Sequence, residues 1–308
     1  MPLQVYQSKT LTKLHKDFCD YSLFEKGYAR GTIRNYQYSW KSLNSFFALE
    51  SLFDISEEIL RQFFYRGQQE KHWSKNTILH HRKNLMPFFK WCTKKKLINE
   101  NPLEQIGKPK IESKIPGHFT NNEIEKLMLS VLKYQYVSDF LRRRDYAILS
   151  MLLTLGLRRE ELLGLKLSDI TFSEMKLKVR AQTSKSKKDR ILPIPQRLKD
   201  ILLEYITERE RIGKSTLYLF ASYNLDAKFT DSGLKLLLKR IQRKTGIHIH
   251  THKFRHTFAT KALESGVDIK TLQILMGHSS IKSTVIYLHT TVKHMQKALE
   301  KNQINYLI

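Results

Sequence analysis

Acidic side chains are scarce in this sequence of 308 residues. Only 29 Asp and Glu stand against 54 Lys and Arg, which gives a formal net charge of +25. Salt bridges within the protein cannot neutralise so large an excess. A polyanionic partner is therefore expected, and nucleic acid leads because Lys and Arg that neutralise phosphates release condensed counterions. A membrane-surface binder and a merely basic protein are the alternatives.

Cysteine is also scarce. The two cysteines, Cys19 and Cys92, lie far apart beside apolar residues, and neither a CxxC motif nor a Cys/His pattern with ligand spacing occurs. This pattern indicates neither a disulfide framework nor a zinc site, and it favours a reducing, intracellular setting.

Signals for membranes and cofactors are missing as well. No apolar run approaches the roughly 20 residues that span a bilayer, and the first ten residues, MPLQVYQSKT, lack the charged and apolar regions of a signal peptide. We therefore predict a soluble cytoplasmic protein with no membrane partner. Neither a GxxxxGK[ST] loop nor an acidic cluster suited to Mg²⁺ occurs, so no nucleotide or metal cofactor is expected.

Apolar residues recur at helical spacing through the first hundred residues. They predict helices over about 8–26, 32–47, 56–63 and 74–91, with Pro87 kinking or restarting the last. With 41% hydrophobic and 11% aromatic residues, the chain can bury a core in each of two domains. We predict an all-helical domain over residues 1–105, in which the aromatic residues form the core rather than platforms for bases.

Basic residues occupy the other faces of these predicted helices. Because the whole chain carries surplus positive charge, we expect them to contact the backbone of a DNA duplex. The candidates are Arg34, His81, Arg82 and Lys83.

A segment with two prolines and no apolar period follows, and it predicts a basic linker over residues 106–117. Thr120 and Glu123 then have the spacing of a capping box, which marks a new helix and a second domain over 118–308. In this domain Met175, Leu177 and Val179 alternate with cations and predict a strand. Residues 191–194 predict a return strand, with the cationic turn TSKSKKDR between the two. The remaining segments predict helices over 145–155, 160–163, 198–212, 231–244, 254–265, 268–276 and 293–302.

Five short motifs occur in order in the second domain. They are GLRREEL at 156–162, Lys185 ahead of KDRILP at 188–193, HKFRH at 252–256, MGH at 276–278 and VIYLH at 285–289. Each is weak alone, but the set resembles the catalytic domain of the tyrosine recombinase (phage integrase) family, in the compact two-domain form of Xer-like, integron or transposon recombinases. Phe254, Met276 and Thr251 depart from the usual pattern only at packing or helix-start positions.

The resemblance implies a mainly helical protein of the tyrosine recombinase fold. An N-terminal SAM-like core-binding bundle would precede a mixed α+β catalytic domain with a small antiparallel sheet. It also implies a site-specific recombinase that cuts and rejoins double-stranded DNA through a 3′-phosphotyrosine. Strand exchange would take place in a homotetramer, with directionality proteins as possible accessories. The tail over 291–308 would then dock into a neighbouring protomer.

Phosphodiester chemistry gives each residue of the set a role. Two guanidiniums, from Arg158 and Arg255, can clamp the non-bridging oxygens, and Lys185 can protonate the departing 5′ oxygen. Phenol is a weak nucleophile, so an imidazole must accept or orient its proton. The remaining assignments are His252 as that imidazole, His278 as a hydrogen-bond donor to the phosphate, Tyr287 as the nucleophile and Glu161 as support for the arginines.

Some assignments have rivals. Lys187 and Lys188 share the predicted turn, so either is an alternative acid, and otherwise both are expected to contact DNA. Tyr306 is a rival nucleophile, although the nine-residue gap after His278 favours Tyr287. His256 is expected to support packing or a backbone contact rather than the chemistry.

Two other functions use similar residues. A type IB topoisomerase needs the same set but no partner site, and a DNA-binding regulator could keep the fold without turnover. The intact six-residue set argues against the regulator, because a protein that only binds DNA needs neither a nucleophile nor an acid.

Overall fold

The computed structural model describes residues 10–110, 117–182 and 188–287. The chain forms two compact units, Met1–Ser113 and Lys114–Ile308, each with its own hydrophobic core. The predicted class, mainly helical with a small antiparallel sheet in the second unit, is confirmed. The predicted helix over 293–302 and the tail lie outside the described residues. Among the helices that are described, none has both the length and the apolar character needed to cross a membrane.

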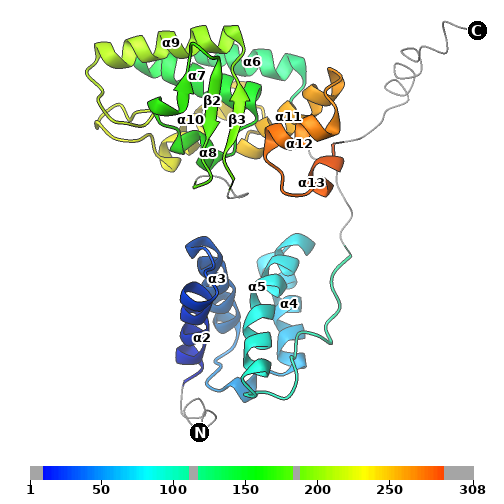
Figure 1. The fold of residues 1–308 in the computed structure, drawn as a ribbon. Coiled ribbons are helices and arrows are strands. Elements are labelled where there is room, and N and C mark those ends of the chain that lie inside the picture. The colour runs from blue at the N-terminus through cyan, green and yellow to red at the C-terminus, as the bar shows by residue number, and fades with distance from the viewer. Residues whose placement is uncertain (1–9, 111–116, 183–187, 288–308) are drawn as a thin grey trace, which may run out of the picture. The chain divides into compact units, whose positions relative to one another are not determined.

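In its described residues the first unit forms a bundle of four helices (Figure 1). They are α2 (Leu11–Asp20), which continues into a π-helical turn at Tyr21–Glu25, α3 (Arg30–Phe46), α4 (Glu57–Lys71) and α5 (Lys75–Lys94), with a 3₁₀ turn at Leu52–Asp54 between α3 and α4. Ser56 and Ser74 cap α4 and α5 by accepting hydrogen bonds from the backbone N–H groups of Ile59 and Thr77.

The aromatic side chains of this unit form its core, as predicted. Phe18, Trp40 and Phe88 are almost fully buried and lie against one another or against the ring of His15. His15 stacks on Trp40 with ring centroids 4.5 Å apart. Burial lowers the pKa of His15 to about 3, so this imidazole is a neutral member of the core.

Helix α5 differs from the prediction in two ways. It runs unbroken through Pro87, so the proline does not restart it. Leu85, Phe88 and Phe89 are fully buried on either side of the proline, and this packing offsets the lost backbone hydrogen bond.

The second difference corrects two predicted DNA contacts. His81 has no exposed surface, and its ring stacks on Trp73 at a centroid distance of 4.2 Å. Arg82 is 6% exposed and donates from Nη1 to the carbonyl oxygen of Leu103 at 2.6 Å. Both side chains are therefore used inside the unit, and we withdraw them from the set of DNA contacts.

The second unit begins with the predicted capping box, in which Thr120 accepts from Glu123 N and Glu123 accepts from Thr120 N. Its helices, in chain order, are α6 (Asn121–Leu132), α7 (Asp139–Leu155), α8 (Arg159–Gly164), α9 (Gln196–Arg211), α10 (Asp231–Thr245), α11 (Thr251–Glu264), α12 (Ile269–Met276) and α13 (Lys282–Val285).

A three-stranded antiparallel sheet interrupts this series after α8 and a 3₁₀ turn at Leu167–Asp169 (Figure 1). The strands are β1 (Ile170–Thr171), β2 (Lys176–Val179) and β3 (Arg190–Pro193). Leu177 pairs with Leu192, and both are buried. β1 was not predicted, because two residues are too few to show a period.

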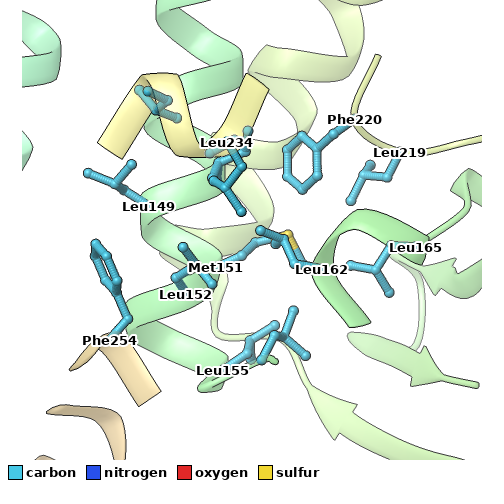
Figure 2. Close-up of a cluster of buried hydrophobic side chains, with 14 of the residues drawn as sticks. Leu149, Met151, Leu152, Leu155, Leu162, Leu165, Leu219, Phe220, Leu234 and Phe254 are labelled. Atoms are coloured by element: carbon cyan, nitrogen blue, oxygen red, sulfur yellow. The ribbon is translucent and has the colours of Figure 1, made fainter. Parts of the chain in front are cut away.

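Helix α7 is the centre of the second core. It packs against α6, α9 and α11, and Figure 2 shows its leucines meeting side chains from α8, α10 and α11. Leu149, Met151 and Leu152 have no exposed surface. This burial fixes the C-terminal end of α7, from which the chain turns into the segment that carries Arg158.

Candidate active site

A glycine turn brings the first arginine into place. Helix α7 ends at Gly156, which has a φ of +56°. A Cβ at this position would lie 2.3 Å from the ring of Phe258, so both the backbone conformation and the space require glycine. Two residues later, Arg158 is the N-cap residue of α8.

Arg158 is held by contacts from two directions. Its Nη1 donates to Glu161 Oε1 at 2.9 Å. Nη1 and Nη2 also lie 3.3 Å from the carbonyl oxygens of Met276 and Gly277, at the C-terminal end of α12. A helix C-terminus carries partial negative charge, which suits a guanidinium. The side chain is 15% exposed, so it is anchored without being sealed off.

Arg255 converges on the same helix end from α11. It is 4% exposed, and its guanidinium donates to the carbonyl oxygen of Gly156 at 2.7 Å and to that of Met276. Met276 O therefore accepts from both arginines. Burial, and then the charge of Arg158, lower the pKa of Arg255 to about 9, which leaves the guanidinium charged at neutral pH.

Glu161 lies between two arginines and has no exposed surface. Arg190, at the start of β3, donates from Nη1 and Nη2 to its two carboxylate oxygens at 3.0 and 2.8 Å. Arg158 adds two more hydrogen bonds, from Nη1 and from its backbone N–H, both at 2.9 Å. Burial acts to raise the pKa of Glu161, but Arg190 and then Arg158 outweigh it and lower the pKa to about 2. The carboxylate is therefore ionised at neutral pH.

Sequence analysis did not single out Arg190. Its Nε also donates to the carbonyl oxygen of Leu275 at 3.0 Å, and its side chain would lie 2.9 Å from a Cβ on Gly277. Arg190 thus links the β2–β3 hairpin to α12 and to Glu161. The available signal was the position of an arginine two residues before the buried Leu192 of the strand, which by itself is too common to indicate a site.

His278 follows the glycine at the end of α12. Its Nδ1 lies 2.9 Å from Thr284 Oγ1. Thr284 is a residue of α13 and is fully buried. Burial, then the charges of Arg255 and Arg158, lower the pKa of His278 to about 4. The ring is therefore neutral at pH 7, and one of its nitrogens carries a proton that can be donated.

Tyr287 is 8% exposed and packs with Ala259, Leu272 and Met276 from α11 and α12. Its Oη lies 2.7 Å from Nδ1 of His256. Burial raises the pKa of this phenol, while Arg255 and Arg158 act in the opposite direction. The predicted nucleophile thus packs with Met276, the residue whose carbonyl oxygen accepts from both Arg158 and Arg255.

His256 was expected to support packing, and its contact with Tyr287 Oη is a finding that sequence reasoning missed. Burial, and then the nearby His252, lower its pKa to about 4. His252 lies on the exposed side of the first turn of α11. A signal was present in the sequence, because residues four apart on a helix share a face, and His256 is four residues after His252.

Three lysines, Lys185, Lys187 and Lys188, lie in the turn predicted between the strands. Lys185 and Lys187 lie outside the described residues, and Lys188 is exposed. The base of the hairpin is fixed by Asp189, which accepts from the backbone N–H of Ala181 at 2.7 Å and pairs with Lys178 at 2.8 Å. Within the described ranges no cluster of His, Cys, Asp and Glu could hold a metal ion.

The remaining predicted DNA contacts, Arg34 and Lys83, are exposed on α3 and α5 of the first unit. Lys83 also lines a hollow of about 980 Å³ whose floor includes Met86 and Trp91. The other cations that line it are Arg82, Lys90 and Lys94, also on α5, and Lys26 and Lys108 from outside that helix. This cationic hollow is a surface suited to a phosphate backbone.

Comparisons with known proteins identify the family of this chain. The family model described as the phage integrase family matches residues 118–294, and that of the phage integrase N-terminal SAM-like domain matches residues 14–99. A tyrosine recombinase of Pseudothermotoga lettingae is 32% identical, over 94% of this chain and 98% of the relative. The tyrosine recombinase XerC of Bacillus subtilis is 30% identical, over 93% and 97%.

Solved structures share the fold. The XerA recombinase is 26% identical with a TM-score of 0.51, covering 95% of this chain and 98% of that chain. The Tn1549 transposon integrase bound to circular intermediate DNA is 19% identical with a TM-score of 0.74, over 94% and 99%. The XerH recombinase bound to its difH substrate is 23% identical with a TM-score of 0.70, over 97% and 86%.

The chain therefore belongs to the phage integrase family. It is a tyrosine site-specific recombinase, an enzyme that cleaves and rejoins DNA, which confirms the predicted function in preference to a type IB topoisomerase or a regulator without turnover.

Proposed function

We propose that this phage integrase family member cleaves duplex DNA with Tyr287 and keeps the cut end as a 3′-phosphotyrosine. The observation that carries the proposal is the convergence of Tyr287 with Arg158 and Arg255, both of which bond to the carbonyl oxygen of Met276. A phenol beside two fixed cations suits a phosphoryl centre, on which negative charge develops during attack.

The two guanidiniums would bind the non-bridging oxygens of the scissile phosphate. Their anchoring matters because donors that are already oriented need no rearrangement when charge develops. Glu161 would support this clamp by fixing Arg158, and Arg190 would hold Glu161 from its other side. His278, neutral and beside the arginines, would donate a hydrogen bond to the same phosphate.

The chemical step balances without a cofactor. Oη of Tyr287 forms a bond to phosphorus as the bond from phosphorus to the 5′ oxygen breaks, and the phenolic proton passes to a base, for which we propose His252. The departing 5′ oxygen takes a proton from Lys185, with Lys187 and Lys188 as alternative acids. Rejoining is the reverse reaction, and the ester conserves the energy of the original bond.

Double-stranded DNA is the proposed partner, because solved relatives were captured on it. XerH was solved on difH substrate, and a lambda integrase dimer was solved on a core site. We further propose a homotetramer for strand exchange, since two sites with two cleavages each need four nucleophiles, together with accessory directionality proteins. The two sequence relatives named above are bacterial proteins, so we place the reaction in the cytoplasm, where bacterial DNA lies.

The test uses a panel of nicked duplexes. Its members carry single nicks at successive positions across a binding site selected by the protein from random-sequence DNA, so that a short product diffuses away after cleavage and traps the covalent complex. Wild-type protein should form a covalent protein–DNA complex on denaturing gels, because escape of the product prevents rejoining. Tyr287→Phe should form none, while retaining DNA binding in gel shifts.

Two controls accompany this test. Tyr306→Phe should trap as wild type does. A mixture of Tyr287→Phe with Arg158→Ala should remain inactive, because the structure builds the nucleophile and the arginines from one chain. Trapping by Tyr287→Phe would show that another residue is the nucleophile. Activity in the mixture would show that Tyr287 acts in the site of a neighbouring protomer.

A further inference from the structure

His256 contacts the reacting atom of the proposed nucleophile, and the chemistry described above does not use it. Its Nδ1 lies 2.7 Å from Tyr287 Oη, and the two rings are tilted by 49° with centroids 5.4 Å apart. This is a hydrogen-bonding arrangement between a helix that carries Arg255 and the segment after α13.

The two protonation states limit the direction of the hydrogen bond between His256 and Tyr287. Burial, followed by the effects of His252, His250 and Arg255, lowers the pKa of His256 to about 4, so the imidazole is neutral at pH 7. Burial raises the pKa of Tyr287, so the phenol keeps its proton. A neutral imidazole has two tautomers, and we assign the one with its proton on Nε2, in which the phenolic O–H donates to Nδ1.

The tyrosine ring is held independently of this bond. Ala259, Leu272 and Met276 are fully buried and form the apolar cluster in which the ring lies. The cluster restricts the ring plane, but apolar contacts do not fix the direction of the hydroxyl hydrogen. Nδ1 of His256 supplies that direction.

We propose that His256 is a positioning residue for Tyr287, the acceptor that orients the phenolic O–H and keeps Oη beside the arginines before cleavage. The inference rests on the proposed function of Tyr287 as nucleophile. Arg255, directly before His256 in the chain, makes a positive charge on this imidazole unfavourable. His256 is thus suited to accept a hydrogen bond from Tyr287 without taking up its proton. Another base then accepts the phenolic proton during cleavage.

Two substitutions separate orientation from proton transfer. In His256→Asn, the side-chain oxygen can take the place of Nδ1 as acceptor but cannot act as a base. His256→Leu keeps comparable volume and removes the acceptor. The measurement is the single-turnover rate of covalent complex formation on the nicked-duplex panel, with gel-shift affinity recorded in parallel.

We expect His256→Leu to lose about 10- to 100-fold in rate, the effect of a small misplacement of a reacting group. His256→Asn should stay within about threefold of wild type because it restores the acceptor. Affinity for the duplex should be unchanged in both. His248→Asn is the matched control, since that exposed histidine lies against His250 rather than Tyr287.

A rate for His256→Asn as low as that of His256→Leu would overturn the proposal, because it would show that a titrating base is needed. A wild-type rate for His256→Leu would overturn it as well. If His256→Leu fails to bind DNA, the rate of His256→Asn decides alone. A near-wild-type rate would support the positioning role, and a tenfold lower rate would contradict it. Trapping by Tyr287→Phe would instead refute the proposed function itself.

Discussion

Glu161 illustrates how one buried residue sets the charge state of the whole site. Its carboxylate has no exposed surface and accepts hydrogen bonds from Arg158 and Arg190. Removing one partner of a buried ionic group leaves the others unpaired, which is more destabilising than the loss of a surface pair. The fixed position of Arg158 therefore depends on a residue that itself touches no substrate.

Glu161→Gln should lower the free energy of unfolding at pH 7 by about 3 kcal/mol, because the ionised carboxylate is replaced by a neutral amide beside two guanidiniums. The pKa of Glu161 is lowered from 4.5 to about 2 in the folded protein. The carboxylate therefore contributes stability above pH 4.5 that is lost as the pH falls toward 2. The measurement is urea unfolding of both proteins at several pH values.

The difference in stability between wild type and Glu161→Gln should shrink over that acid range. Glu160→Gln is the matched control, since Glu160 is 71% exposed and its nearest cation, Arg159, lies 3.5 Å away. A pH-independent difference for Glu161→Gln would show that its ionisation is not the source of the stability.

At the residue scale, the sequence predicted which residues form the site better than it predicted which side chains are buried. The structure brings together five residues of the predicted set: Arg158, Glu161, Arg255, His278 and Tyr287. The order of the motifs predicts this, because it matches a known arrangement. Which of several neighbouring cations is buried was not predictable. On α5, His81 is 0% exposed, Arg82 is 6% exposed and the next residue, Lys83, is exposed. The packing of α5 on its neighbours decides which of these side chains is buried.

Elements followed the hydrophobic pattern closely where they were long. Most helices of both units agree with the predicted positions within a few residues, since several turns of apolar period give a strong signal. The exceptions are α4, which ends at Lys71 rather than at 63, and α7, which begins at Asp139 rather than at 145. Short elements depend on partners instead. β1 has two residues and exists because β2 pairs with it, and Pro87 sits inside α5 because buried leucine and phenylalanine residues hold the helix on both sides.

The β2–β3 hairpin carries the proposed acid. Lys185→Ala should slow cleavage of an ordinary phosphodiester by about 10²- to 10⁴-fold, the typical contribution of a positioned acid. The same variant should recover on a substrate with sulfur in place of the bridging 5′ oxygen, because a thiolate leaves without a proton. The measurement is the single-turnover rate on both forms of the nicked duplex.

Lys187→Ala and Lys188→Ala are the matched controls for this hairpin test. Both should lose DNA affinity and show no specific recovery with the sulfur substrate, since we expect them to contact the backbone. Recovery by Lys188→Ala in place of Lys185→Ala would assign the acid to Lys188. Equal rates of Lys185→Ala on both substrates would exclude Lys185 as the acid.

At the scale of the whole molecule, charge is the property that sequence and structure share most directly. The formal net charge of +25 is a count and needs no fold. What the fold adds is position, because Arg34 and Lys83 are exposed on helices of the first unit, while Arg255 is buried and Arg158 partly buried in the second. The first unit thus offers cations for binding and none of the proposed chemistry, whereas the second unit holds the site together with the exposed Lys188.

This division predicts how affinity depends on salt. Each phosphate that a cation neutralises contributes about −0.9 to the slope of log affinity against log salt concentration. Arg34→Gln and Lys83→Gln should each make the slope less negative by about 0.9 if each contacts one phosphate, with little change in the rate of covalent trapping at saturating protein. Fluorescence anisotropy on the intact selected duplex, at about 50 to 200 mM salt, measures the slope.

Arg66→Gln is the matched control for this salt test. It removes the same formal charge from the same unit, but its guanidinium is already paired with Glu70 at 2.7 Å and lies over the ring of Phe46. Its slope should stay at the wild-type value. An unchanged slope for Arg34→Gln and Lys83→Gln would remove both from the DNA contacts. An equal effect of Arg66→Gln would mean that net charge acts on the duplex without defined contacts, because long-range attraction depends on total charge rather than on where each cation lies.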